Sequence, residues 1–154
     1  MQVRLIAVGT RMPSWVEVGY TEYAKRLPKE WRLQLREIPL RRRGKGTDRE
    51  RLMAEEGKQM LTALGNARGI ALDSRGLQWS TEELADQLST WLQEGRDLGF
   101  LIGGPEGLAP ECLQRAEIHW SLSRLTFPHA LVRILVVEQL YRAWTLLQGH
   151  PYHR

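Results

Sequence analysis

The stretch LGFLIGGPEGL, residues 98–108, decides the fold class because it joins a strand to a loop rich in glycine. The apolar run over 98–102 predicts a short buried strand, and the glycines that follow end it. Pro110 lies where a proline commonly starts a helix, and a helix is predicted over 110–118. This part of the chain therefore predicts a strand, a loop and a helix in succession.

The same succession repeats on both sides of this stretch. Further strands are predicted over 3–9, 31–39 and 68–76 and within 119–129. Helices are predicted over 13–27 with Ser14 as the cap, from a Thr47–Glu50 capping box to Leu64, from a Ser80–Glu83 capping box to Gly95, and over 129–149. This alternation predicts an α/β fold with a mostly parallel sheet flanked by helices, in a single domain over 1–154.

The cysteine and histidine content limits the classes of site. The single cysteine, Cys112, excludes an internal disulfide, predicts a reducing, cytoplasmic compartment, and is expected to be a partly buried helix residue. The histidines and nearby acids lack the spacing of metal ligands, so no metal is predicted. No apolar run approaches the roughly 20 residues of a membrane span, and no signal peptide is recognised, so no membrane association is expected.

Positive charge is concentrated in one part of the chain. Eleven lysines and arginines lie between Lys25 and Arg51, and the whole chain carries a net charge of +4. A basic segment of this kind favours a polyanionic partner, and RNA is the most common one in the cytosol. The alternative is a basic surface that serves only solubility.

Three loops are candidates for a ligand site, because parallel sheets bind ligands at the carboxyl ends of their strands. They follow Leu72, Ile102 and Leu122. The glycines after Ile102 would let backbone approach a ligand closely, although they match neither a Walker motif nor the dinucleotide fingerprint, and a plain turn would also explain them. The loop that begins at Leu122 would bind the edge of an adenine through its backbone N–H and C=O groups, or it would only cover the core.

The last predicted helix is apolar nearly all round but carries Glu138 and Arg142 at a spacing that allows pairing. This pair is either an internal salt bridge or part of a catalytic site. The apolarity suggests a homodimer interface. His119 is expected to be structural, whereas His129 has both a structural and a functional interpretation.

Four stretches together resemble a known family: LIAVGTRMPSWVEVGYTEYAKRLPKE (5–30), LIGGPEGL (101–108), SLSRLTFPHALVRILVVEQLYRAW (121–144) and HPYHR (150–154). They resemble the ribosomal RNA large subunit methyltransferase H family, whose members are SPOUT-class enzymes, and the resemblance runs from residue 1 to 154. It implies a trefoil knot near the C-terminus, a homodimer, and S-adenosylmethionine bound in the knot near the partner subunit. It also implies methylation of N3 of a pseudouridine in 23S rRNA, with the assembled ribosome as the substrate.

The resemblance also implies which residues bind the cofactor, and Arg124 among them would contribute its backbone only. The implied cofactor-binding residues are Leu72, Gly103, Gly104, Leu122, Ser123, Arg124, Leu125, Thr126 and Phe127.

The tail HPYHR places reactive side chains at the end of the chain, where they would fold over the site when RNA arrives. His153 is the first candidate for the general base, because N3–H of pseudouridine must lose its proton. Tyr152 would stack on the base, and Arg154 and Arg142 would bind a phosphate or stabilise a developing oxyanion. Glu138 would orient Arg142 or His129.

Two other functions remain open from the residues alone. One is an RNA-binding or ribosome-associated protein without catalytic activity, and the other is a nucleotide-binding α/β module of another class. Binding of S-adenosylmethionine separates both from the methyltransferase.

Overall fold

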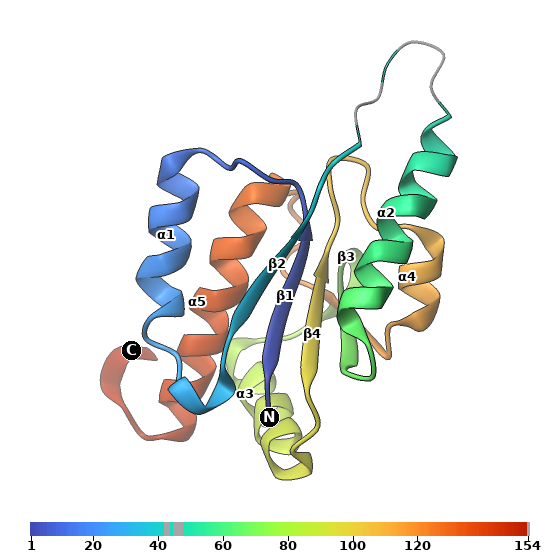
Figure 1. Cartoon of the computed structure of the whole chain (residues 1–154). Coiled ribbons are helices and arrows are strands. Elements are labelled where there is room, and N and C mark those ends of the chain that lie inside the picture. The colour runs from blue at the N-terminus through green and yellow to red at the C-terminus, as the bar shows by residue number, and fades with distance from the viewer. Residues whose placement is uncertain (42–43, 45–47, 154) are drawn as a thin grey trace.

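The computed structural model describes residues 1–41, 44 and 48–153. Within these residues, five parallel strands form one sheet in the order β2-β1-β4-β3-β5 (Figure 1). The strands are β1 Val3–Val8, β2 Gln34–Ile38, β3 Arg68–Gln78, β4 Leu98–Ile102 and β5 Ile118–Ser121. The helices are α1 Ser14–Ala24, α2 Arg49–Leu64, α3 Thr81–Glu94, α4 Pro110–Arg115 and α5 His129–Leu147, with 3₁₀ turns over Lys29–Trp31 and Pro151–His153. The predicted alternation of strands and helices is confirmed.

Helices cover both faces of the sheet, with α2 and α4 on one face and α1, α3 and α5 on the other (Figure 1). The central strands β1 and β4 are buried on both faces, because neighbouring residues point to opposite sides and helices cover each side. Leu5 packs with the α3 and α5 side, whereas Ile6 packs with the α2 and α4 side. This explains why the central strands read as continuous apolar runs.

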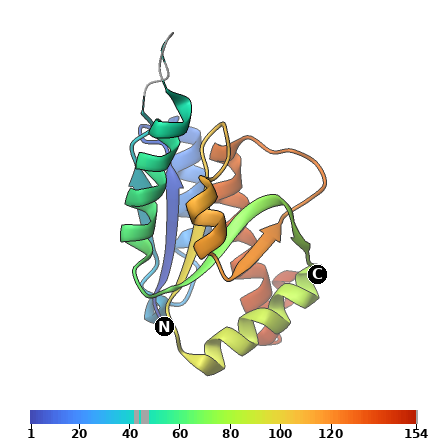
Figure 2. The ribbon, with the colours of Figure 1, turned by 90° about the vertical axis from the view of Figure 1, so that its right-hand side faces the viewer.

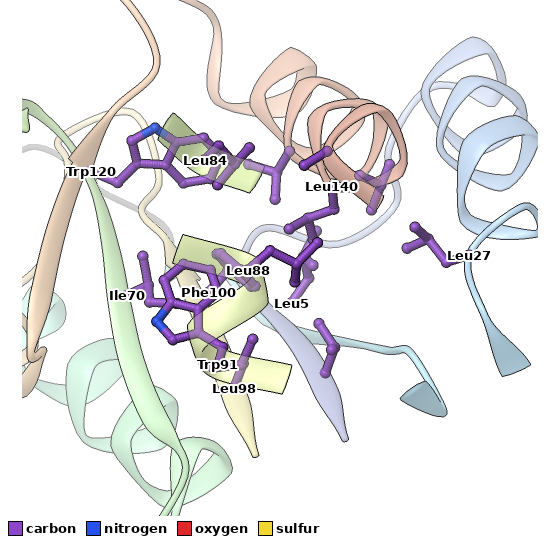
Figure 3. Close-up of a cluster of buried hydrophobic side chains, with 14 of the residues drawn as sticks. Leu5, Leu27, Ile70, Leu84, Leu88, Trp91, Leu98, Phe100, Trp120 and Leu140 are labelled. Atoms are coloured by element: carbon purple, nitrogen blue, oxygen red, sulfur yellow. The ribbon is translucent and has the colours of Figure 1, made fainter. Parts of the chain in front are cut away.

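The larger core lies between the sheet and helices α3 and α5 (Figure 3). Its aromatic rings meet edge to face, with centroids 6.2 Å apart for Trp91 and Phe100 and 6.1 Å apart for Phe100 and Trp120. Leu88 of α3 and Leu140 of α5 fill the space around these rings (Figure 3). Burial of these large side chains against β4 and β5 fixes the strand ends from which the candidate ligand loops leave.

Two predicted helix starts have different outcomes. The Ser80–Glu83 capping box is confirmed, since the Glu83 amide donates to Ser80 Oγ at 3.0 Å and the Ser80 amide donates to Glu83 Oε1 at 3.1 Å. The prediction that Ser14 caps α1 is wrong. Pro13 occupies the cap position without a side-chain hydrogen bond, and Ser14 is already helical.

The start of α2 differs from the predicted Thr47–Glu50 box. Thr47 lies outside the described residues, and the observed cap is Asp48, whose Oδ1 accepts a hydrogen bond from the Arg51 amide at 3.1 Å. Asp48 therefore supplies the acceptor for a first-turn amide.

Two element boundaries also differ from the predictions. Strand β2 begins three residues later than predicted, because the chain first makes the 3₁₀ turn over Lys29–Trp31 and Arg32 takes a positive φ of 44°. Helix α4 ends at Arg115 instead of residue 118, because Ala116 turns to an extended conformation and Ile118 pairs with Ile70 of β3. Pairing with the sheet thus outweighs helix propensity at this boundary.

Strand β3 is longer than predicted and is interrupted. Its pairing with β5 shifts between Leu72 and Leu77, so the residues between them bulge out of the sheet. Gly76 passes so close to β5 that an added Cβ would lie 2.5 Å from the carbonyl carbon of His119. The bulge positions Asp73 and Ser74 beside the carboxyl end of β4. The trefoil knot implied by the resemblance stays a prediction.

Candidate functional site

A pocket lies at the carboxyl ends of the strands, where the three predicted loops meet. The cavity has a volume of about 150 Å³ and opens to solvent, so it is smaller than the roughly 300–1,000 Å³ of typical small-molecule sites. The implied cofactor residues that line it are Leu72, Gly103, Gly104, Leu122, Ser123, Leu125, Thr126 and Phe127. Arg124 is exposed and does not line the pocket, and the backbone role implied for it stays a prediction.

Further lining residues were not predicted as cofactor contacts. They are Asp73, Ser74, Ile102, Gly107, Trp120, Ser121, His129 and Val132. Asp73 and Ser74 directly follow Leu72, so the position of a strand end could have identified them. His129 and Val132 come from the first turn of α5, which directly follows the third loop, so the sequence already indicated that His129 faces these loops.

The loop after β4 needs glycine at two positions because its own backbone turns tightly there. A Cβ on Gly103 would lie 2.4 Å from the carbonyl carbon of Gly107, and a Cβ on Gly104 would lie 3.1 Å from Val8 Cγ1. The Gly107 amide donates to the Gly104 carbonyl oxygen at 3.0 Å, and Gly107 has a φ of +87°. The Cβ positions therefore favour the tight turn, which the sequence left as the alternative explanation, and close approach of a ligand stays a prediction. These glycines let the loop turn tightly at the pocket wall.

The third wall is the segment between β5 and α5, which leaves the sheet as a wide loop (Figure 2). Ser121 Oγ donates to the Ser123 carbonyl oxygen at 2.9 Å, and Ser123 Oγ accepts from the Leu125 amide at 3.0 Å. These local hydrogen bonds shape the first turn of the loop. Leu125 is 70% exposed at the pocket mouth, where it can cover a bound molecule.

The half-buried His129 is the first residue of α5 and lines the pocket. Burial lowers its pKa from the usual 6.5, and the nearby Arg133 guanidinium lowers it further because it disfavours a second cation. The imidazole is therefore neutral near pH 7. A neutral imidazole beside the pocket can accept a proton or a hydrogen bond.

We expect the NMR titration midpoint of His129 to lie below 6.5 in the folded protein. Because the folded-state pKa is the lower one, protonation favours unfolding, and this contribution to stability is lost as the pH falls below about 6.5. The variant Arg133→Met should move the midpoint upward. A His129→Gln sample assigns the signal, and a midpoint at or above 6.5 would contradict the assignment of a neutral imidazole.

Arg133 is a buried charge in an apolar helix, with 2% of its surface exposed. Its guanidinium donates to Glu37 Oε2 at 2.6 Å and to the Gly9 carbonyl oxygen at 2.7 Å. It thereby ties α5 to the carboxyl ends of β1 and β2, close to the pocket. The ion pair with Glu37 and the hydrogen bond to Gly9 explain how a charged residue is accommodated in this apolar helix.

The variant Arg133→Met is expected to lower the free energy of unfolding by about 2 kcal/mol. The Gly9 carbonyl oxygen loses its buried donor, which costs about 1–3 kcal/mol, whereas Glu37 is 35% exposed and can be solvated. Urea unfolding measures this loss. Arg96→Met is the matched control, since Arg96 pairs with Glu117 at the surface, where such pairs contribute about 0–1 kcal/mol. Equal losses in both variants would contradict the importance of the buried arginine.

Glu138, Arg142 and Tyr152, three of the predicted catalytic residues, form a group. The Arg142 guanidinium donates to Glu138 Oε1 at 2.6 Å, and the Tyr152 hydroxyl donates to the same oxygen at 3.2 Å. The expected Glu138–Arg142 pair is thus present. Glu138 contacts Arg142 and Tyr152 rather than His129, so the alternative that it orients His129 is not what the structure shows.

This group lies far from the pocket of its own chain. Helix α5 has 19 residues, and at 1.5 Å per residue Arg142 is about 20 Å further along the axis than His129. The 3₁₀ turn Pro151–His153 lies at the end of α5 that is remote from the glycine loop (Figure 1). The structure describes His153 through its backbone only, and Arg154 lies outside the described residues. The described part of the tail, residues 150–152 and the backbone of His153, therefore does not reach the pocket of its own chain.

The basic residues between positions 25 and 51 belong to several elements. Lys25 and Arg26 follow the last turn of α1, whereas Arg36 lies on β2 and Arg49 and Arg51 start α2. Arg36 also lines a polar hollow together with Arg4 and Arg96. The basic residues Arg42, Arg43 and Lys45 lie outside the described residues. The described basic residues therefore come from separate elements and are not gathered in one loop.

Cys112 and His119, the other two residues considered in the sequence, have structural roles. Cys112 is fully buried on α4, and burial together with Glu111 raises its thiol pKa to about 11, which disfavours a nucleophilic thiolate. Nε2 of His119 lies 2.7 Å from the Leu113 carbonyl oxygen, as expected of a structural histidine.

The described residues contain no group of three or more histidines, cysteines and acids able to hold a metal ion. None of the helices in the described ranges is long and apolar enough to span a membrane.

Comparison with known proteins identifies the family. The family model described as "Predicted SPOUT methyltransferase" matches residues 1–153. A protein of Alkalilimnicola ehrlichii named Ribosomal RNA large subunit methyltransferase H is 62% identical over the whole chain and 99% of its own length. The chain belongs to this family of SPOUT methyltransferases. A protein of the same name from Methylococcus capsulatus is 59% identical, with both chains covered completely.

Solved structures with low sequence identity share the SPOUT fold. A probable methylase family protein from Haemophilus influenzae has a TM-score of 0.62 at 14% identity, covering 99% of this chain and 70% of that one. A tRNA (m1G37) methyltransferase from Aquifex aeolicus has a TM-score of 0.57 at 16% identity, covering 92% of this chain and 70% of that one. The α/β fold class of a SPOUT methyltransferase, a parallel sheet flanked by helices, is thereby confirmed.

Proposed function

We propose that this SPOUT methyltransferase transfers a methyl group from S-adenosylmethionine to N3 of a pseudouridine in 23S rRNA, acting on the assembled ribosome. The observation that carries the proposal is the pocket, because the three loops to which the family resemblance assigns the methyl donor meet there. The full-length relatives named Ribosomal RNA large subunit methyltransferase H support the choice of ribosomal RNA.

The residues of the pocket fit S-adenosylmethionine. The molecule combines a flat adenine, a ribose and a charged amino-acid end. Leu72, Ile102 and Phe127 supply apolar wall for the adenine, and Asp73 and Ser123 supply polar groups for the hydroxyl and amino groups. Such a wall with a few polar groups is typical of a nucleoside site.

The chain's own residues have two tasks, positioning and removal of a proton. Bound S-adenosylmethionine supplies a methyl group that is already activated on a sulfonium. N3–H of pseudouridine is a weakly acidic imide, so a base must accept its proton as the nitrogen attacks. His153 is proposed as this base, and Tyr152 as the ring that stacks on the uracil. Arg142, held by Glu138 at 2.6 Å, is proposed to stabilise negative charge on a carbonyl oxygen or to bind a phosphate.

The proposed enzyme is a homodimer in which each tail serves the pocket of the other subunit. Because Arg142 lies about 20 Å along α5 from His129, the tail of one chain cannot complete the pocket of that chain while α5 stays helical. Helix α1 also exposes two large apolar side chains, Trp15 at 59% and Val18 at 69%. They lie beside α5, whose Leu131 and Leu135 are half-buried. This apolar surface is proposed to be the dimer interface.

Calorimetric titration with S-adenosylmethionine tests the proposal against its rival. The proposal predicts saturable binding of about one molecule per chain. A ribosome-associated RNA-binding protein without catalytic activity would bind RNA but not the methyl donor. Absence of binding at millimolar ligand, with a folded protein, would therefore overturn the proposed function.

A further inference from the structure

Three tyrosine rings and two guanidinium groups gather where α1, α5 and the tail meet. The Arg26 guanidinium lies 5.1 Å from the ring centroid of Tyr23, 5.7 Å from that of Tyr141 and 5.9 Å from that of Tyr152. The rings of Tyr141 and Tyr152 meet edge to face at 4.6 Å. The Arg142 guanidinium lies 5.1 Å from the Tyr152 ring. We call this group the tyrosine cluster.

Carboxylates hold both guanidinium groups of the tyrosine cluster in place. Arg26 donates to Glu22 at 2.6 Å and Arg142 donates to Glu138 at 2.6 Å, each pair spaced by one helical turn. Each arginine is thus tied to a helix while it contacts the tail, Arg26 just beyond the end of α1 and Arg142 within α5. A cation over an aromatic face attracts the ring electrostatically.

The tail leaves α5 through a hydrogen bond at His150 and then forms the 3₁₀ turn Pro151–His153. The His150 amide donates to the Thr145 carbonyl oxygen at 2.8 Å, and the Tyr152 amide donates to His150 Nδ1 at 3.3 Å. Tyr152 itself is placed by its ring and hydroxyl, which contact α5 and Arg26. Arg26 is the link to α1, because it contacts a ring from α1, a ring from α5 and the ring of the tail.

We propose that Arg26 is a positioning residue of the methyl transfer, which holds Tyr152 and thereby the tail in the conformation used in the reaction. The proposal rests on the proposed function, in which the tail contacts the target base. Arg26 acts through Tyr152 and not on the methyl donor. A displacement of about 1 Å of a positioned group can lower a rate about 100-fold, so loss of this contact should reduce turnover strongly.

Three variants test the role of Arg26. Arg26→Gln keeps much of the length but removes the cation, Arg26→Lys keeps the cation, and Arg96→Gln is a matched control. Arg96 also pairs with a glutamate and is similarly exposed, at 40% against 34% for Arg26, but has no ring contact among the described residues. Glu22 retains Lys25 at 3.1 Å in the Arg26 variants, so no carboxylate loses its only partner.

Methyl transfer to ribosomes and hydrogen exchange of the RNA-free protein are the two measurements. Arg26→Gln is expected to lower kcat at least about 10-fold, with KM for ribosomes and affinity for S-adenosylmethionine within about 2-fold. Exchange of the His150 and Tyr152 amides should accelerate in the same variant. Arg26→Lys should restore kcat and the slow exchange of these amides, and Arg96→Gln should change neither kcat nor exchange.

The other outcomes are also decisive. Unchanged kcat in Arg26→Gln overturns the proposal, whether or not exchange of the tail accelerates. A loss that appears in KM with unchanged exchange overturns it too, because Arg26 would then contact RNA directly. If the wild-type protein transfers no methyl group at all, the proposed function fails first, and the inference fails with it.

Discussion

Gly103→Val is expected to lower the affinity for S-adenosylmethionine about 100-fold. Its Cβ would lie 2.4 Å from the carbonyl carbon of Gly107 and 2.8 Å from the Leu108 amide nitrogen, so the loop at the pocket wall must open. Overpacking of this kind costs about 1–3 kcal/mol, and 2.7 kcal/mol corresponds to about 100-fold in affinity. The loop lies at the surface, so the fold itself should persist.

Calorimetry on folded variants measures this effect. Gly95→Ala is the control, because Gly95 ends α3 at a positive φ of +72° with nothing within 4 Å of an added Cβ. It should lose some stability, as alanine is strained at positive φ, and keep its affinity for the methyl donor. Equal affinity of Gly103→Val and the wild type would place the methyl donor elsewhere.

Removal of residues 150–154 is expected to lower turnover by about 10²–10⁴-fold, the usual contribution of a general base, while the affinity for S-adenosylmethionine stays unchanged. The reason is that the proposed base and the stacking tyrosine are on the tail, whereas no tail residue lines the pocket within the described residues. Single-turnover transfer to ribosomes measures the chemical step. Wild-type turnover of the shortened chain would exclude the tail from catalysis.

A mixture of two inactive chains shows which pocket the tail serves. In a mixed dimer, the shortened chain supplies an intact pocket and the Gly103→Val chain supplies an intact tail. If the tail acts across the dimer, mixing restores part of the activity. If each tail serves its own pocket, every subunit remains defective and no activity returns.

The position of the pocket was predictable because it depends on a general property of parallel sheets. Strands that run in one direction end at one edge, so the loops after Leu72, Ile102 and Leu122 had to lie near one another. The role of Gly103 was not predictable in the same way. Whether its missing Cβ faces a ligand or Gly107 depends on the turn that the loop makes, which the residue order alone does not define.

The predicted last helix already implied a long distance between the tail and the pocket. The expectation that the tail folds over the site did not take this distance into account. A helix over 129–149 is about 30 Å long, which already separates its two ends. The partners of Arg133 could not be predicted, because Gly9 and Glu37 are 124 and 96 residues away in the chain. Such contacts depend on tertiary packing and not on local patterns.

Methyl transfer to ribosomes that lack the modification tests the central claim most directly. The protein is incubated with these ribosomes and S-adenosylmethionine carrying a deuterated methyl group, and the 23S rRNA is digested to nucleosides for mass spectrometry. The account predicts deuterated N3-methylpseudouridine with the wild-type protein and far less with Gly103→Val at the same subsaturating concentration of S-adenosylmethionine. A deuterated methyl group on another nucleoside, or no transfer by a protein that binds the methyl donor, would contradict it.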